Sequence, residues 1–528
     1  MPPILAIPTN STALARIIHQ VQNKSLGAAS KWLSQQAITT PKEAKDEYTA
    51  CLPQGTFSFL QDLPIVVETT AAQLTSDAGL LAIREFDERI GLTRDFAALL
   101  NDPRDPKKFD HSFLDMSRAR IYGILADYVD QNDHDTLRSD PVFKLIADRL
   151  PDDPDLASQP TLSRFENTID IASLKRLREQ FVDQFIASFV IPPRRLTFDL
   201  DAVDDPTHGA QQLSLFHGYF EQYQYFPSFI TSADNDQVVV LSLRPGAVHA
   251  ALGGDDDLRY LVERLRRVWP DVRICIRGDA GYGMPWMYAV CEELNVEYLF
   301  GLSANKKLQK ASETLLAEAV RKFDETKTPQ RLFDAFWYQA GTWEHARWVI
   351  VKAEANAQGT NRRFIVTNRP GAQVVPGAAY DDYAERGESE NRNKELKCGL
   401  QIDRTSDHRF MANFFRLYLH AAAFNLLVRF RQAMALPPLP EPPPAVPPQA
   451  LPDAERRRHY QRCRQRDPLA QAQPCTWRTL LIKVAAEIIV STRRVVVRLS
   501  THWPNLDYFQ RVCQCLATIP SPPTPTTS

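Results

Sequence analysis

The alternation of apolar and polar residues divides the chain into a helical region followed by an α/β region. Between about residues 57 and 190, apolar residues recur at helical spacing; in LTSDAGLLAIREFDERIGL, for example, Leu80, Ile83 and Phe86 fall on one face. From Arg194 the pattern changes to strands such as RRLTFDLDAV, VRICIRGDAG and VEYLFGLSA, between which lie the helices DLRYLVERLRRVWP and MPWMYAVCEEL. Consecutive strands followed by helix, strand, helix and strand predict a mixed sheet with helices packed on it, an α/β core.

Further strands and long helices follow the α/β region, and a proline-rich run then separates them from the C-terminal segment. Residues 330–368 return to strand-like texture, and residues 381–434 predict long helices. The run PPLPEPPPAVPPQALP at 437–452 predicts an extended linker, because proline fixes φ and lacks the N–H donor that helices and sheets need. The remaining segments are expected to be a loosely ordered arm at 1–56, a small C-terminal module at 453–518 and a disordered tail at 519–528.

Charge is balanced over the whole chain but not along it. The 62 Lys and Arg against 64 Asp and Glu give a net charge of −2, which by itself does not indicate a polyanionic partner. Residues 453–528 nevertheless contain 12 Lys and Arg against 5 Asp and Glu, a local charge of +7, mostly in RRRHYQRCRQR and TRRVVVR. Such a segment suits binding to phosphates with little sequence preference, and a tethered, solvated helix is the alternative.

Composition excludes several other classes of protein. The eight cysteines form no C-x2-C pair and have no histidine spacing that would indicate a zinc site. No run of about 18 apolar residues and no cleavable leader is evident. We therefore expect a soluble cytoplasmic protein without a membrane partner.

Carboxylates on two predicted strands are the first candidates for chemistry. Asp199 and Asp201 lie two residues apart on the apolar strand LTFDLDAV and share a face if the strand is regular. Asp279 closes the strand RICIRGD, at the carboxyl end where sites form in α/β sheets. The alternatives are an aspartate that caps a helix and an aspartate that pairs with an arginine.

A later helix supplies a third carboxylate. Tyr383, Arg386, Glu390 and Lys397 follow one another at spacings of 3, 4 and 7, which places them on one helix stripe. A solvated, charged helix face is the ordinary explanation of such a stripe. Two strand aspartates and a helix glutamate can, however, hold two divalent ions such as Mg²⁺ or Mn²⁺, which promote in-line phosphoryl transfer.

Several separate blocks of the sequence together resemble DDE transposases of the insertion-sequence type, and more narrowly insertion-sequence family 1380. The segments that carry the resemblance are FDLDAVDDPTHGAQQLSLFHGYF, LRPGAVHA, VWPDVRICIRGDAGYGMP, the Y-R-E-K spacing from Tyr383 to Lys397, and the N-terminal blocks LTSDAGLLAIREFDERIGL and SDPVFKLIADRLPDDPDLASQPTLSRFEN. The resemblance covers about residues 57–515.

The resemblance implies a ribonuclease H-like catalytic domain in which Asp201, Asp279 and Glu390 are catalytic and bind two Mg²⁺ (or Mn²⁺) ions. Asp199 is the reserve candidate for the first aspartate. Tyr383, Arg386 and Lys397 would contact phosphates near the cleaved strand. By the same resemblance, we expect a helical DNA-binding or dimerisation region at 57–190, the catalytic domain at 191–302 and 381–436, and a β-rich insertion at 303–380.

Further DNA contacts are expected outside the catalytic domain. Trp337, Trp343 and Trp348 in the insertion could stack on a flipped base, with core packing as the alternative. Ser163 and Arg164 would face outward from a recognition helix that SQPTLSRFEN begins, although an ordinary capped helix explains this segment nearly as well. The basic candidates of the C-terminal module are Arg456, Arg457, Arg458, Arg493 and Arg494.

The function implied by the resemblance is cut-and-paste DNA transposition. The protein would bind the terminal inverted repeats of its element, hydrolyse a phosphodiester and transfer the strand to target DNA. The partners would be double-stranded transposon ends and target DNA, with a homodimer in the synaptic complex at a bacterial nucleoid. A transposase-derived regulator without turnover and a stand-alone nuclease of the same fold are the alternatives.

Overall fold

The computed structural model describes residues 55–57, 63, 65–105, 107–369, 375–436, 462, 466–467, 469 and 472–519. The chain divides into two compact units, 1–71 and 72–528. In the first unit, the short strands β1 (Gly55–Phe57) and β2 (Ile65–Val67) form an antiparallel pair. Most of the expected arm, the whole of the expected linker at 437–452 and almost all of the expected tail lie outside the described residues.

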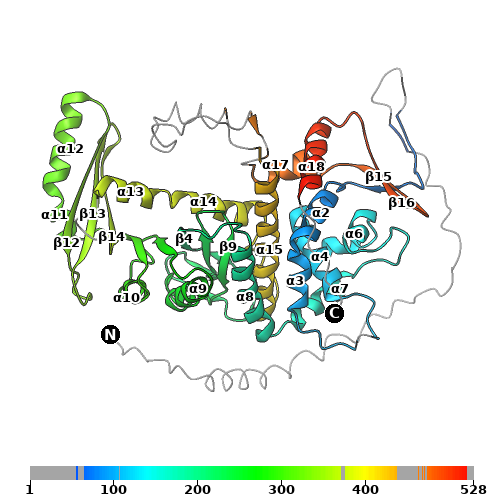
Figure 1. Cartoon of the computed structure of the whole chain (residues 1–528), viewed down its shortest axis with the longest axis horizontal. Coiled ribbons are helices and arrows are strands. Elements are labelled where there is room, and N and C mark those ends of the chain that lie inside the picture. Colours follow the sequence, from blue (N-terminus) through cyan, green and yellow to red (C-terminus); the bar gives the residue numbers. More distant parts are fainter. Residues whose placement is uncertain are drawn as a thin grey trace, which may run out of the picture. The chain divides into compact units, whose positions relative to one another are not determined.

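A mixed sheet forms the centre of the second unit (Figure 1). Its first five strands in chain order are β4 (Arg195–Ala202), β8 (Ser228–Ser232), β9 (Val238–Ser242), β10 (Arg273–Gly278) and β11 (Glu297–Leu302). They lie side by side in the order β9-β8-β4-β10-β11. β10 is parallel to β4 and to β11, whereas β8 is antiparallel to both β4 and β9. This is the ribonuclease H-like arrangement that the family resemblance implied.

The β-rich insertion continues the same sheet. Its strands are β12 (Gln330–Tyr338), β13 (Arg347–Asn356) and β14 (Gly359–Thr367), and β14 pairs antiparallel with β11. The sheet therefore has eight strands and ends at β12. Two helices, α11 (Lys306–Ala311) and α12 (Glu313–Thr326), precede these strands, and α12 packs against β12 and β13.

Helices cover both faces of the sheet. Apolar residues of α8 (Ile171–Ala187), α9 (Gly254–Val268) and α10 (Pro285–Glu293) share one core with Phe198 and Ile276 of the strands. The opposite face is covered by α13 (Pro376–Ala384), whose Ala379 and Tyr380 belong to one apolar core with Cys275 of β10. Because successive strand residues point to opposite faces, Cys275 and Ile276 contribute to different cores.

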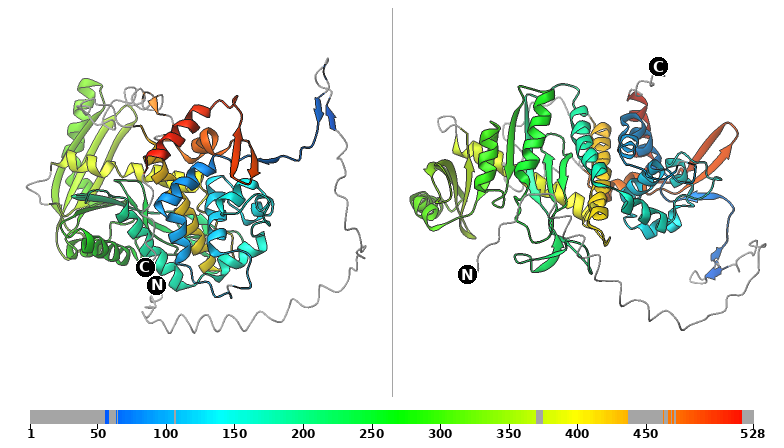
Figure 2. Two further views of the ribbon diagram at one scale, coloured as in Figure 1. Left: turned by 45° about the vertical axis from the view of Figure 1, so that its right-hand side comes forward. Right: turned by 90° about the horizontal axis from the view of Figure 1, so that it is seen from below.

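A long helix, α15 (Phe410–Met434), joins the sheet to the N-terminal helices. It contacts β9 and α8 as well as α2 (Leu80–Ile90), α3 (Leu92–Ala98), α4 (Phe113–Leu125) and α7 (Gln159–Thr168). The shorter helices α5 (His134–Leu137) and α6 (Pro141–Ile146) complete this region. Figure 2 shows the blue and cyan helices gathered beside the gold α15. In the described part of the chain, no helix is long and apolar enough to cross a membrane.

The C-terminal segment shares the core of the N-terminal helices. β15 (Ala486–Ser491) pairs with β16 (Arg494–Leu499) and with β3 (Gln73–Thr75), and α18 (Leu506–Thr518) contacts α2 and α15. Between α15 and β15 lies the short α17 (Pro474–Trp477), whose Trp477 is fully buried against Phe430. Residues 472–519 thus pack with the helical region rather than standing apart from it.

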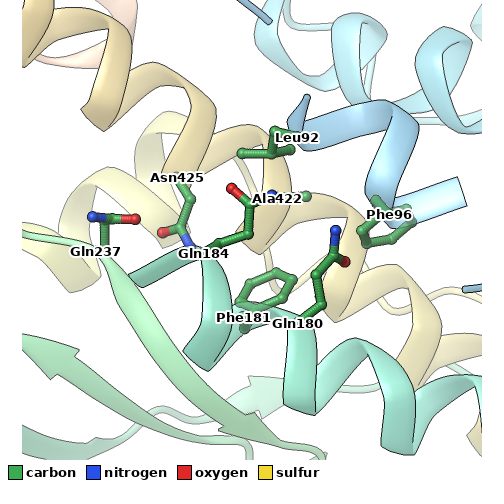
Figure 3. A pocket seen from close by; sticks show the side chains of 8 residues that line it. All are labelled: Leu92, Phe96, Gln180, Phe181, Gln184, Gln237, Ala422 and Asn425. Carbon is green, nitrogen blue, oxygen red and sulfur yellow. The ribbon is translucent and has the colours of Figure 1, made fainter. Parts of the chain in front are cut away.

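A small cavity lies where α3, α8 and α15 meet (Figure 3). Its volume is about 10 Å³, which is room for one water molecule. The carboxamides of Gln180, Gln184 and Asn425 are among its lining groups. Both polar atoms of the Gln180 side chain are buried and lack a hydrogen-bond partner among the described residues.

Candidate active site

The alternation of side chains along β4 decides which face receives its carboxylates. Leu196, Phe198 and Leu200 point into the core beneath α8 and α9. Asp199 and Asp201 must therefore point to the other face, which α13 and α14 (Gly387–Lys394) approach. An apolar strand with two polar positions on one face thus carries both aspartates to the helices that contain the Y-R-E-K residues.

Asp201 lies at the carboxyl end of β4 and is surrounded by hydrogen-bond donors. Arg386 Nη2 is 3.1 Å from Asp201 Oδ2, and Asn393 Nδ2 donates to the same oxygen at 2.7 Å. The backbone N–H of Ala202 donates to Oδ1. Burial raises the pKa of Asp201 to about 6, although Arg386 opposes this effect, and the neighbouring carboxylates of Asp279 and Glu390 raise it further.

The other two predicted carboxylates lie at the same end of the sheet. Asp279 follows β10, is half-buried and accepts a hydrogen bond from the Gly281 N–H at 2.9 Å. Glu390 lies on α14, its side chain is 62% exposed, and its Oε1 is 3.7 Å from Arg386 Nη1. Arg386 therefore links Asp201 and Glu390, and Asp279 lies near enough for its charge to raise the pKa of Asp201.

Tyr383 approaches this cluster through a gap that a glycine leaves open. A Cβ added to Gly301 in β11 would lie 2.9 Å from the Tyr383 hydroxyl and 2.7 Å from the backbone nitrogen of Ala280. Both distances are too short for a methyl group, so glycine allows Tyr383 and the segment after Asp279 to meet here. Burial raises the pKa of the half-buried Tyr383, and Arg386 opposes this effect.

The single helix stripe expected for the Y-R-E-K residues is wrong in two places. α13 ends at Ala384 and α14 begins at Gly387, so Arg386 lies in the turn between them. After α14 the chain forms a π-helical turn at Glu395–Gly399, which changes the direction of the side chains that follow. Lys397 consequently contacts Asp204, with Nζ 2.9 Å from Oδ1, rather than Glu390.

Asp199 belongs to a buried ion network instead of the carboxylate cluster. It is fully buried and receives Arg277 through two hydrogen bonds of 2.7 and 3.0 Å, and Arg392 through a third of 3.0 Å. Arg392 also binds Asp236 at 2.7 Å. Asp199 is therefore an aspartate that pairs with arginines, which was one of the alternatives that the sequence left open. The network of Asp199, Arg277 and Arg392 holds α14 against β4 and β10.

Sequence reasoning missed Arg277, Arg392 and Asn393 as parts of the site. Arg277 shares the face of β10 with Asp279, two residues away, and this spacing is a signal that could have identified it. Arg392 and Asn393 lie within the charged run of α14, where nothing in the pattern distinguishes them from solvated residues. Their partners come from a strand more than 190 residues earlier.

The three tryptophans of the insertion have different environments. Trp343 is 6% exposed and packs edge-on against Tyr288, so it belongs to the core. Trp337 and Trp348 form a paired layer, with ring centroids 4.9 Å apart and an interplanar angle of 12°. Trp337 is 63% exposed and lies on the edge strand β12.

The expected outer DNA contacts lie on two separate elements. Ser163 is half-buried and Arg164 is exposed on α7, where Arg164 Nη2 donates to the Thr161 hydroxyl at 3.0 Å. Arg493 and Arg494 are exposed at the turn between β15 and β16. Arg456, Arg457 and Arg458 lie outside the described residues.

The donor set suits a hard divalent ion, although the carboxylates do not yet form a closed ligand shell. Within the described ranges, no group of three His, Cys, Asp or Glu side chains is arranged so that it could hold a metal. The ligands available around Arg386 are carboxylate oxygens, which Mg²⁺ and Mn²⁺ prefer. Burial is the main cause of the raised pKa of Asp201, and the nearby carboxylates of Asp279 and Glu390 add negative charge that a cation would offset.

Comparison with known proteins identifies the family. Residues 57–438 match the family described as Transposase DDE domain group 1. No curated protein sequence matches the chain. One similar solved structure is "Cryo-EM structure of piggyBac transposase synaptic complex with hairpin DNA (SNHP)", at 13% identity over 71% of this chain and 77% of that chain, with a TM-score of 0.34. Because the family match spans well over half of its residues, the chain belongs to the Transposase DDE domain group 1 family.

Proposed function

We propose that this protein is a DNA transposase of the insertion-sequence 1380 type, which binds its terminal inverted repeats and moves them by cut-and-paste transposition. The observation that carries the proposal is the meeting of Asp201, Asp279 and Glu390, from two strands and a later helix, around Arg386. The reaction would hydrolyse a phosphodiester to expose a 3′-hydroxyl and would then use that hydroxyl for strand transfer.

Asp201, Asp279 and Glu390 would hold two Mg²⁺ or Mn²⁺ ions. When bound, such ions supply the positive charge that stabilises the entering and leaving oxygens of an in-line phosphoryl transfer. The chain's own part is to hold the carboxylates ready: Arg386 contacts Asp201 at 3.1 Å and Glu390 at 3.7 Å. The 62% exposed side chain of Glu390 leaves the cluster accessible to a DNA strand.

Tyr383, Arg386 and Lys397 would contact phosphates beside the cleaved bond. The Nε atom of Arg386 is buried and lacks a hydrogen-bond partner among the described residues, so this guanidinium is not saturated by the contacts around it. Lys397 would reach a phosphate by exchanging its contact with Asp204. Guanidinium and ammonium groups both bind phosphate oxygens through charge-assisted hydrogen bonds.

The outer contacts would hold the double-stranded DNA. Phosphate or base contacts would come from three places: Ser163 and Arg164 on α7, Arg493 and Arg494 at the β15–β16 turn, and the basic run Arg456 to Arg458. The stacked pair Trp337 and Trp348 would offer a surface on which a base could stack. A reaction on two transposon ends requires at least a homodimer, and transfer also requires target DNA.

Cleavage of end-containing duplex DNA with Mg²⁺ tests this function. Asp201→Asn, Asp279→Asn and Glu390→Gln should each reduce cleavage at least 1,000-fold while leaving DNA binding within a few fold of the wild type. Glu388→Gln is the matched control, because Glu388 is an exposed carboxylate on the same helix. Full cleavage by all three variants would overturn the assignment.

Two further outcomes separate the alternative functions. Binding of end DNA by the wild-type protein without metal-dependent nicking would indicate a regulator descended from a transposase. Nicking without a joined product on target DNA would indicate a stand-alone nuclease. A joined product that requires all three carboxylates would support transposition.

A further inference from the structure

We infer that Asn393 is a positioning residue that holds the Asp201 carboxylate in the orientation needed for metal binding. This inference rests on the proposed metal site and extends it to a residue outside the Y-R-E-K spacing. Asn393 lies three residues after Glu390 on α14, so the two side chains share a face of the helix. That face is the one directed at Asp201.

The two carboxylate oxygens of Asp201 contact different partners. Oδ2 receives the Asn393 carboxamide at 2.7 Å and the Arg386 guanidinium at 3.1 Å. Oδ1 receives the Ala202 N–H at 3.0 Å. The Ala202 N–H on Oδ1 and the Asn393 carboxamide on Oδ2 hold the plane of the carboxylate by hydrogen bonds, and the ion pair with Arg386 adds to this restraint.

Asn393 differs from Arg386 in the kind of support it gives. Arg386 is charged, and its guanidinium also contacts Glu390 at 3.7 Å. The carboxamide of Asn393 is neutral, so it orients Asp201 without neutralising the negative charge that attracts a cation. Hydrogen bonds from neighbouring residues to ligating carboxylates commonly change metal affinity by about 10- to 100-fold.

The anchoring of α14 makes this hydrogen bond a fixed feature. Arg392, next to Asn393, is 6% exposed and binds Asp199 at 3.0 Å and Asp236 at 2.7 Å. Consecutive residues of α14 therefore reach Asp199 and Asp201, which are consecutive residues on one face of β4. The contact between Arg392 and Asp199 holds the helix against the strand, and the contact between Asn393 and Asp201 orients the proposed metal ligand.

Metal binding without DNA tests the inference directly. We would titrate the full-length protein with Mn²⁺ and measure free Mn²⁺ by electron paramagnetic resonance. Asn393→Leu, which keeps the volume but removes the donor, should raise the Kd for Mn²⁺ by about 10- to 100-fold. Asn393→Gln, which retains the carboxamide, should recover part of the lost affinity for Mn²⁺. Asp201→Asn gives the background level of Mn²⁺ binding that remains when the proposed site is removed.

Asn391→Ala is the matched control, because Asn391 is exposed on the same helix and binds Glu388 at 3.0 Å. A second measurement separates positioning from a structural role. In single-turnover cleavage of end DNA, Asn393→Leu should raise the half-saturating Mg²⁺ concentration by the same factor, with a rate at saturating Mg²⁺ close to the wild type. If Asn393→Leu only impaired folding, its cleavage rate would be low at every Mg²⁺ concentration. In that case the titration is repeated with Asn393→Ala.

The outcomes distinguish this inference from the proposed function. If Asp201→Asn loses Mn²⁺ binding and cleavage while Asn393→Leu and Asn393→Ala match the wild type in Kd and Mg²⁺ requirement, the role of Asn393 is overturned and the metal site stands. If the wild-type protein neither binds Mn²⁺ nor cleaves, both proposals fail. A raised Kd in both Asn393 variants, with Asn391→Ala unchanged, supports the inference.

Discussion

The buried carboxylate of Glu166 on α7 offers a strong test of how the helical region is held together. Glu166 is fully buried and lies between two arginines: Arg120 of α4 donates to it at 2.8 Å, and Arg416 of α15 donates at 2.5 Å. Both arginines are themselves buried. The change Glu166→Gln keeps the shape of the side chain but removes the negative charge that both buried arginines share, and leaves Arg416 only its longer 3.9 Å ion pair with Asp407.

Two independent estimates give the size of the effect. Breaking a buried ion pair by removing one partner costs about 3–5 kcal/mol. Burial alone would raise the pKa of Glu166, but Arg416 and Arg120 outweigh it and lower the pKa to about 2. Relative to an ordinary value of 4.5, this difference corresponds to roughly 3 kcal/mol of stability, which is present above pH 4.5 and is lost as the pH falls toward 2.

The assay is thermal unfolding at neutral pH, followed by circular dichroism. A unit the size of residues 72–528 has an unfolding entropy of about 1 kcal/mol/K, so the Tm of Glu166→Gln should fall by about 3–5 °C. The control is Glu325→Gln, which removes an exposed pair with Arg321 and should cost at most about 0.5 kcal/mol. Equal Tm values for the two variants would refute the reasoning.

Three further predictions concern other buried groups. Burial, together with Arg120, lowers the pKa of His420 to about 3, so the folded state keeps this histidine neutral while the unfolded chain is protonated below pH 6.5. His420 should therefore contribute a loss of stability of about 1.4 kcal/mol for each unit that the pH falls below 6.5, and Tm measured from pH 7 to 5 should fall less steeply in His420→Gln. Gly301→Ala should reduce DNA cleavage about 100-fold without loss of DNA binding, because its methyl group would displace Tyr383 and the segment after Asp279. Gln180→Leu should raise the Tm, because it removes a buried carboxamide that lacks partners among the described residues, at a gain of about 1 kcal/mol.

Each of these predictions has a control and a contrary result. A His420→Gln profile as steep as the wild type would show that other groups set the acid sensitivity. Gly341→Ala adds a methyl group where no atom lies within 4 Å, so it should cleave normally; equal cleavage by Gly301→Ala would contradict the steric argument. Gln184 accepts a hydrogen bond from Arg429 at 2.7 Å, so Gln184→Leu should lower the Tm, and a lower Tm for Gln180→Leu would instead indicate that a water molecule satisfies Gln180.

The sequence by itself predicted the class of fold and a short set of candidate carboxylates. Apolar residues at a period of two marked β4 and β10, and placed Asp199, Asp201 and Asp279 on or just after these strands. These features are local, since they depend on how neighbouring residues alternate between core and surface. The Y-R-E-K spacing from Tyr383 to Lys397 is also local, and it was the family resemblance, not the spacing alone, that singled out Asp201 and Glu390.

The tertiary structure decided which of these residues meet and what else they contact. Only the fold shows that Asp199 is held by Arg277 and Arg392, that a π-helical turn carries Lys397 to Asp204, and that Asn393 reaches Asp201. It also joins β14 to β11 and β15 to β3, which makes β12–β14 part of the central sheet and the C-terminal segment part of the helical core. Such contacts join residues from tens to hundreds of positions apart, and a charged run on a helix looks the same in sequence whether its partner is water or a buried strand.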